Sequence, residues 1–278
     1  MNPSSALSFQ LLSCSVLVQF DDVLIGERMR YMVPPAQQPP QQTCQLHYRV
    51  SGSRPYAIFE EDDYLETFND ADDVLYRIYA RAYSRMIDRY VEAGWVFLHA
   101  GLVRINQKRV MLIGDSGAGK TTLTARLLFD GHGFEGDEMV LAQPGRAMAA
   151  PRCLHLKEGI ERNIPELAGQ LDRLPTVQGD GRNIYALDPT GFGLQWEITI
   201  GTIDHIVYVR PNHGSDTSLT ALSTLQTMKH VTESFMGWGR TNRLLASAAA
   251  DLSRRAGHEL ALGDPVSGAR LLEKLTKQ

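Results

Sequence analysis

A glycine-rich segment at residues 114–121 has the residue types and the spacing most clearly suited to chemistry. Its sequence, Gly-Asp-Ser-Gly-Ala-Gly-Lys-Thr, fits the pattern G-x-x-x-x-G-K-[ST]. In this pattern backbone N–H groups surround phosphate oxygens, the lysine reaches the outer phosphates, and the last hydroxyl holds Mg²⁺. The segment therefore predicts a site for a nucleoside triphosphate, although it does not say what becomes of the phosphate.

The residues on either side of this loop agree with the motif. Residues 109–113 are apolar and predict a buried strand, whereas residues 122–129 are rich in helix formers and are followed by Gly131. A strand, a glycine loop and a helix in this order are the context in which the motif binds phosphate. The predicted nucleotide-binding residues are Gly114, Asp115, Ser116, Gly117, Ala118, Gly119, Lys120, Thr121 and Thr122.

Asp137 and Glu138 form an acidic pair that the chain should return to the phosphate loop. A helix of about eleven residues climbs roughly 16 Å from the loop, and about five extended residues come back the same distance. A right-handed crossover then brings the pair to the edge of the sheet where phosphates bind. Acids there can hold Mg²⁺ or accept a proton from an attacking hydroxyl. We predict Asp137 as the base and Thr121, Asp137 and Glu138 as metal ligands, with the division between the two acids left open.

Four more side chains are candidates for the site. His99 lies inside an apolar strand, where a histidine is usually a packing residue. Arg152 and Lys157 belong to one short predicted strand and lie on opposite faces if that strand is regular, so without a bulge at most one of them should face the site. Arg182 belongs to a segment that predicts either a loop over the site or a surface hairpin. We treat Arg152, Lys157 and Arg182 as candidate substrate-binding residues.

The chain divides into a β-rich N-terminal lobe, residues 1–69, and a catalytic domain, residues 70–278, with a bridging helix at residues 70–93. The lobe is either structural or a docking surface for a peptide or protein substrate, by strand addition. The helix has apolar residues at three- and four-residue spacing and acids in its first turn. The strands predicted in the lobe are residues 15–20, 45–50 and 56–60.

The catalytic domain alternates predicted strands and helices, which indicates the α/β class. Residues 95–103 and 108–113 predict a hairpin that delivers the phosphate loop, a departure from the simple βαβ order. The other predicted strands are residues 139–142, 203–210 and 259–262, and the other predicted helices are residues 160–171, 218–232, 241–256 and 266–275.

Composition narrows the class of protein. The 278 residues are 43% hydrophobic and 22% charged, as in soluble globular proteins, and the net charge of −4 predicts neither a nucleic acid nor a membrane partner. Three scattered cysteines indicate reduced thiols and a cytoplasmic location, and the eight histidines include no H-E-x-x-H. The apolar run at residues 11–20 lacks the positive start of a secretory signal, so we predict a strand pair there.

Three stretches together resemble the catalytic domain of HPr kinase/phosphorylase: residues 97–103, the loop at 114–121, and Gly-His at 131–132 followed by the acidic pair. That family has a strand histidine before the loop, a Gly-x-Ser-Gly-x-Gly-Lys-[Ser/Thr] loop, and an Asp-Asp pair after a Gly-His turn. The resemblance covers roughly residues 95–275. It implies a P-loop kinase fold similar to phosphoenolpyruvate carboxykinase, and it implies that His99 lies near the phosphates. It also implies catalytic roles for Lys120, Asp137 and Glu138.

Departures from that family point to a subgroup. The stretch Glu-[Ile/Val]-Arg-Gly-Leu-Gly is absent and residues 152–159 stand nearby instead, so recognition of HPr and the phosphorylase reaction do not follow. The chain is similar to HPr-kinase-like enzymes of peptide biosynthesis, including those that phosphorylate the C-terminal serine of lasso-peptide precursors. This resemblance implies ATP, Mg²⁺ and a peptide or protein substrate with a serine hydroxyl. HPr kinases are hexamers, so a homo-oligomer is an expectation from the resemblance alone.

We therefore predict a cytoplasmic ATP-dependent serine kinase. One alternative is a P-loop ATPase or GTPase in which Glu138 orients water, although the signatures L-S-G-G-Q and N-K-x-D are both absent from the sequence. The other is a nucleotide-binding regulatory protein with no phospho-acceptor. The identity of the acceptor is not encoded in any motif that we can identify.

Overall fold

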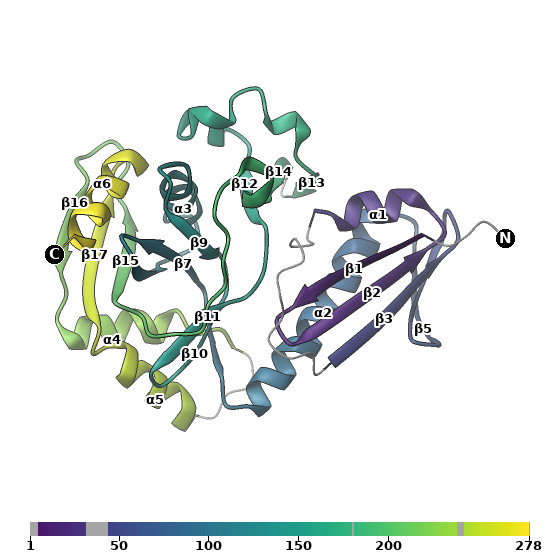
Figure 1. Ribbon diagram of the computed structural model, residues 1–278, viewed down its shortest axis with the longest axis horizontal. Helices are drawn as coiled ribbons and strands as arrows, with labels where there is room; N and C mark the ends of the chain where they lie inside the picture. Colours follow the sequence, from purple (N-terminus) through teal and green to yellow (C-terminus); the bar gives the residue numbers. More distant parts are fainter. Residues whose placement is uncertain (1–4, 32–43, 180, 238–241, 278) are drawn as a thin grey trace.

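The computed structural model describes residues 5–31, 44–179, 181–237 and 242–277. This part of the chain forms a mixed α/β structure with a five-stranded sheet near the N-terminus and a six-stranded sheet whose strands lie between residues 100 and 262. Two three-stranded sheets lie between them, and the ends of the chain lie at opposite sides of the molecule (Figure 1). None of the described helices is long and apolar enough to cross a membrane.

The N-terminal sheet has the strand order β1-β2-β3-β4-β5. Apolar residues alternate along it, and in β2 the buried positions are Cys14, Val16, Val18 and Phe20. The strands predicted at residues 15–20, 45–50 and 56–60 are confirmed. The strand pair predicted within residues 11–20 is wrong in its bounds, because that run holds only β2 and the partner strand covers Ser5–Leu11. The sequence patterns also did not reveal α1 or β5. Asp22 caps α1 by accepting a hydrogen bond from the N–H of Leu24. The elements are β1 (Ser5–Leu11), β2 (Cys14–Phe20), α1 (Val23–Met29), β3 (Cys44–Ser51), β4 (Tyr56–Glu60) and β5 (Asp63–Phe68).

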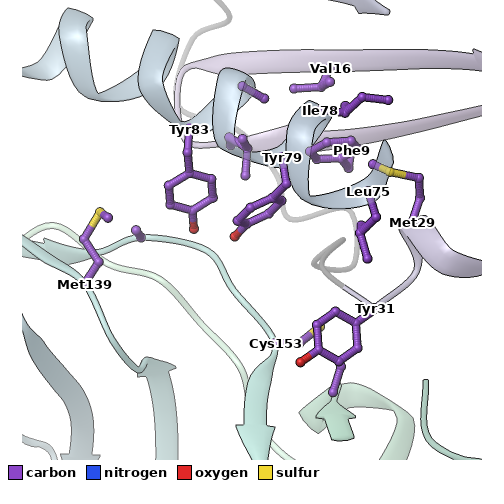
Figure 2. Packing of buried hydrophobic residues seen from close by; sticks show 14 of the residues in the cluster. Phe9, Val16, Met29, Tyr31, Leu75, Ile78, Tyr79, Tyr83, Met139 and Cys153 are labelled. Carbon is purple, nitrogen blue, oxygen red and sulfur yellow. The ribbon is translucent and has the colours of Figure 1, made fainter. Parts of the chain in front are cut away.

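Helix α2 (Ala71–Glu92) connects the N-terminal sheet to the rest of the molecule, close to the predicted bounds. Asp70 caps its first turn, and the buried side of the helix includes Leu75, Ile78 and Met86. One continuous core runs from the N-terminal sheet through α2 to the chain around Met139 and beyond (Figure 2). Helix α2 therefore packs against both parts of the protein.

The six-stranded sheet, of order β16-β17-β15-β8-β7-β9, holds the phosphate loop. The predicted hairpin is confirmed, because β7 (Ala100–Ile105) pairs antiparallel with β8 (Lys108–Ile113), and helix α3 (Lys120–Phe129) follows the loop. The predicted continuous strand at 95–103 is wrong. It breaks at His99, and β6 (Val96–Leu98) pairs in another sheet with β10 (Val140–Gln143), whose second partner is β11 (Arg146–Ala149).

A buried ion pair fixes β9 (Gly133–Gly136), the strand that leads to the acidic pair. The guanidinium of Arg109 donates to both oxygens of Glu135 at 2.8 Å, and the two side chains are 6% and 1% exposed. Arg104 adds a third hydrogen bond to Glu135 at 3.1 Å. A planar guanidinium that binds a carboxylate through two nitrogens sets both distance and orientation. The ion pair therefore fixes the end of β9, from which the chain continues to Asp137 and Glu138.

The segment after β11 differs from the prediction. A helix expected at 160–171 is replaced by three short 3₁₀ turns, η1 (Ile160–Arg162), η2 (Pro165–Leu167) and η3 (Leu171–Arg173). Pro165 has no N–H to donate to residue 161, and Gly169 takes a positive φ of 72°, so a continuous helix cannot form. β12 (Leu154–Lys157) pairs with β14 (Arg182–Leu187), which forms a hairpin with β13 (Thr176–Gly179) and precedes η4 (Pro189–Phe192). Of the two expectations for residues 175–193, the hairpin is confirmed.

The C-terminal elements complete the six-stranded sheet and its covering helices. The predicted helix at 218–232 begins later, because residues 218–221 pair with β17 and Ser223 then caps α4 together with Gln226. The predicted helix at 241–256 ends at Leu252, and its expected first residue lies outside the described residues. The elements are β15 (His205–Pro211), β16 (Ser218–Ala221), α4 (Thr224–Glu233), α5 (Asn242–Leu252), β17 (Ala256–Leu262) and α6 (Pro265–Thr276).

Candidate functional site

Three glycines give the phosphate loop a backbone with positive φ values. Gly114, Gly117 and Gly119 have φ values of 149°, 82° and 96°. A Cβ on Gly114 would lie 2.4 Å from the carbonyl oxygen of Val209, so no other residue fits this turn. Gly119 caps α3 without any side-chain hydrogen bond, which leaves the first N–H groups of the helix open toward the loop. Open N–H groups at a helix N-terminus attract phosphate oxygens.

The ammonium of Lys120 lies within the loop. The residue is 6% exposed, and Nζ donates to the carbonyl oxygens of Gly114 at 2.7 Å and Asp115 at 3.1 Å. Burial lowers the pKa of Lys120, and the nearby carboxylates of Asp137 and Glu138 oppose this shift. The lysine is thus held where its charge is poorly solvated, so an anion entering the loop would gain a strong partner.

Asp137 lies directly beside the loop. The hydroxyl of Thr121 donates to its Oδ2 at 2.6 Å, and its Oδ1 is buried with no hydrogen-bond partner among the described residues. Burial raises the pKa of Asp137, while the hydrogen bond from Thr121 acts in the opposite direction. Gly101 on β7 leaves the space for this carboxylate, since a Cβ there would come within 3.1 Å of Oδ1. The prediction that Asp137 and Glu138 return to the loop is therefore confirmed.

Glu138 faces His99 and occupies a strained position. Its φ is 82°, which is uncommon for a residue with a side chain and is often found at functional sites. Oε1 lies 3.4 Å from Nδ1 of His99. The hydrogen bond from His99, together with the charges of Arg152 and Lys120, lowers the pKa of Glu138 to about 2 against the effect of burial. His99 is thus not a packing residue of a strand but a partner of an ionised carboxylate.

Arg152 and Lys157 both line the same cavity as the loop, so the expectation that at most one of them would do so is wrong. Lys157 is the last residue of β12, so the alternation of side chains along that strand sets its direction. Arg152 lies before β12, so the alternation does not apply to it. Nη2 of Arg152 donates to Nδ1 of His155, and Nε of Arg152 is buried without a partner among the described residues. Arg182 is exposed at the start of β14 and does not line this cavity.

The cavity over the loop has a volume of about 410 Å³, which is within the range of small-ligand sites. One part of its lining comes from the loop and the acidic pair, and a second wall comes from the segment around β12 and η1. Sequence patterns did not reveal that second wall, because no motif marks a site built from 3₁₀ turns and a hairpin. The lining residues that sequence patterns missed are Cys153, His155, Leu156, Glu158, Gly159, Ile160, Asn163 and Ile184.

The residues beside Thr121 suit Mg²⁺. They offer hydroxyl and carboxylate oxygens, which this ion prefers, and the buried Oδ1 of Asp137 lacks any other partner among the described residues. No group of three or more His, Cys, Asp or Glu side chains in the described part of the chain could hold a metal by itself. Mg²⁺ usually binds through one or two carboxylates together with the phosphates of a substrate, so two protein oxygens are sufficient.

His155 should make stability depend on pH. Burial, followed by the charge of Arg152, holds the pKa of His155 well below its usual range. Below about pH 6.5 the unfolded chain binds a proton that the folded protein does not, so the free energy of unfolding falls as pH falls, by up to about 1.4 kcal/mol per pH unit. We expect His155→Gln to flatten this decline in urea unfolding between pH 7 and pH 5. His213→Gln, in an exposed loop, is the matched control, and equal slopes in wild type and His155→Gln would contradict the expectation.

Among known proteins, likeness to this chain is found in solved structures. No protein-family model matches the chain, and no curated protein matches it. Among solved structures it is similar to the Hpr(Ser) kinase/phosphatase from Coxiella burnetii, at 12% sequence identity and a TM-score of 0.32. The overlap covers 65% of this chain and 93% of that one. Because the overlap is so loose, function has to be argued from the residues of this chain.

Proposed function

We propose that this protein is a phosphotransferase that uses MgATP to phosphorylate a hydroxyl group. The observation that carries the proposal is the contact between Thr121 and Asp137, with Oγ1 2.6 Å from Oδ2. It places an acidic pair beside a phosphate-binding loop, within one cavity. Loop N–H groups, a lysine, two carboxylates and two further cationic side chains are the parts that phosphoryl transfer requires.

Binding of the triphosphate would change the hydrogen bonds of the loop. Lys120 gives up the carbonyl oxygens of Gly114 and Asp115 and turns to the outer phosphates, where its charge is better compensated. The N–H groups at the start of α3 bind the remaining phosphate oxygens. Mg²⁺ bound at Thr121 and Asp137 would neutralise charge on the phosphates. Arg152 and Lys157, which line the same cavity, would stabilise charge on the phosphoryl group in transfer.

We further propose that Glu138, rather than Asp137, accepts the proton. Asp137 is occupied by the Thr121 hydroxyl at the loop, whereas Glu138 lines both this cavity and a second one beside it. The hydroxyl oxygen forms a bond to the γ-phosphorus, its proton passes to Glu138, and the bond from the γ-phosphorus to the bridging oxygen breaks to release ADP. A low pKa suits this role because phosphoryl transfer needs an ionised, correctly placed carboxylate more than a strong base.

The proposed acceptor is a serine hydroxyl of a polypeptide. A serine hydroxyl of a peptide or protein, including a lasso-peptide precursor, follows only from the sequence resemblance described above, as do a cytoplasmic location and a homo-oligomer. The rival ATPase and the non-catalytic regulator share the loop and the acidic pair. The cationic side chains of Arg152 and Lys157 in the same cavity argue against the regulator, which has no phosphoryl group in transfer to stabilise. An ATPase transfers the same group to water, so the fate of the phosphate decides between it and a kinase.

The test is a mass balance of phosphate. The protein is incubated with γ-labelled ATP, Mg²⁺ and a synthetic library of serine-containing peptides, and ADP, free phosphate and phosphopeptide are quantified. We expect ADP and phosphopeptide in equal amounts, with no transfer by Lys120→Met and normal transfer by Lys274→Met, which alters an exposed lysine of α6. ADP with free phosphate and no phosphopeptide would identify an ATPase, and bound ATP without turnover would identify a regulator.

A further inference from the structure

A second cavity, which the nucleotide site does not use, lies along α2. Its volume is about 590 Å³. One wall is a face of the helix, and the other comes from the chain around Met139 and Met236. We call this space the α2 groove. Its lining residues are Tyr79, Ala80, Tyr83, Ser84, Ile87, Asp88, Val91, Glu138, Met139, Arg152, Met236 and Gly237.

The α2 groove is long. Its helical wall extends from Tyr79 to Val91, which at the helical rise corresponds to about 18 Å. An extended peptide rises about 3.3 Å per residue, so five or six residues would fill that length. The wall is formed by aromatic and aliphatic side chains, with Asp88 as the acidic residue on the helix. These dimensions suit an extended, uncharged stretch of polypeptide better than a compact small molecule.

Two buried polar atoms of residues that line the α2 groove make no hydrogen bond of normal length and angle among the described residues. They are Nε of Arg152 and the hydroxyl of Tyr79, which lies next to the hydroxyl of Tyr83. The hydroxyl of Tyr83, beside Tyr79, donates to the carbonyl oxygen of Pro151 at 2.7 Å. Figure 2 shows both tyrosines extending from α2 toward the chain that carries Met139 and Cys153. Buried polar atoms without partners are costly, so a ligand that satisfies them is favoured here.

The α2 groove meets the nucleotide cavity at two residues. Glu138 and Arg152 line both spaces, and Glu138 is the carboxylate to which we assign the proton of the acceptor. A hydroxyl group held at this end of the groove would therefore lie between the proposed base and the loop.

We propose that the α2 groove binds an extended segment of a polypeptide acceptor, with the hydroxyl residue at Glu138 and uncharged apolar residues along α2. This assignment rests on the proposed function, because it needs phosphoryl transfer to give the groove a reaction. The Tyr79 hydroxyl and Arg152 hydrogen bond to the peptide backbone, and the apolar wall selects the side chains. Acidic residues in the segment are disfavoured by Asp88 and Glu138.

The test fills the groove without touching the nucleotide cavity. Ser84 is exposed, lines the groove and does not line the nucleotide cavity, so Ser84→Trp should block the peptide while the affinity for ATP stays unchanged. We expect kcat/KM for the library's preferred serine peptides, those with apolar flanking residues, to fall at least about ten-fold. Glu92→Trp is the matched control, since it is exposed on the same helix outside the groove. Tyr79→Phe should raise KM about five-fold, the size of one neutral hydrogen bond, with kcat unchanged.

The outcomes separate the two proposals. If the wild-type protein consumes MgATP but forms no phosphopeptide, the polypeptide acceptor and the groove assignment are overturned, whereas no consumption of MgATP at all overturns the proposed function. If the wild type phosphorylates peptides and Ser84→Trp does so at the same kcat/KM, the α2 groove is not the acceptor site. Loss of ATP affinity in Ser84→Trp, or equal phosphorylation of free serine and of peptides by the wild type, would overturn the assignment as well. An unchanged KM in Tyr79→Phe would overturn the contact assigned to its hydroxyl.

Discussion

Replacing Asp137 with asparagine should lower the rate of phosphoryl transfer from MgATP by about 10³-fold. The substitution keeps the shape of the side chain and can keep the contact with the Thr121 hydroxyl. It removes the negative charge that balances a cation at the loop, and it places an amide where a carboxylate oxygen now lies buried without a partner. Binding of ATP without Mg²⁺ should remain close to normal, and the Mg²⁺ concentration for half-maximal rate should rise.

The control for this variant is the same change at an unrelated acid. Asp130 ends α3 and pairs with Arg126, so Asp130→Asn should leave both the rate and its Mg²⁺ dependence unaltered. Initial rates of phosphopeptide formation over a Mg²⁺ titration measure both quantities. Transfer by Asp137→Asn at the wild-type rate would refute the position of this acid at the metal, and with it the role of the Thr121 contact.

Glu138→Gln should lower the same rate by about 10²- to 10³-fold, for a different reason. The amide keeps the volume of the side chain but cannot accept a proton from the acceptor hydroxyl. Because the Mg²⁺ site is assigned to Thr121 and Asp137, the Mg²⁺ concentration for half-maximal rate should not change. The wild-type pKa of about 2 also means that the activity should not decline through this carboxylate between pH 8 and pH 5. The measurement is a Mg²⁺ titration and a pH profile of kcat for wild type and variant.

The two variants together decide between the acids. A shifted Mg²⁺ dependence in Glu138→Gln, with a normal one in Asp137→Asn, would exchange their roles and return Asp137 to the position of the base. A variant of His99 gives a further test, because its Nδ1 lies 3.4 Å from Oε1 of Glu138 and orients that carboxylate. His99→Gln should resemble Glu138→Gln in its Mg²⁺ dependence but with a smaller loss of rate, because it orients the base rather than replacing it.

The phosphate loop and the return of the acidic pair could be predicted from the sequence because both depend on local order along the chain. A glycine loop between a strand and a helix has few alternatives, and the lengths of the helix and of the next strand set where residue 137 comes back. The helix at residues 70–93 and the hairpin that ends in the phosphate loop, residues 100–113, were likewise found from periodicity and turn residues. In each case the residues that decide the structure are neighbours in sequence.

Tertiary packing alone decided which side chains share the site. The break at His99 arises because β6 and β7 join different sheets, and that pairing depends on β10, some forty residues further along the chain. Arg152 reaches the cavity since it precedes β12, and Arg182, on the hairpin, stays outside. The Arg109–Glu135 pair that anchors β9, and the α2 groove that meets the loop at Glu138, join residues far apart in sequence. Such contacts form only when separate elements pack together, so periodicity and motif spacing contain no record of them.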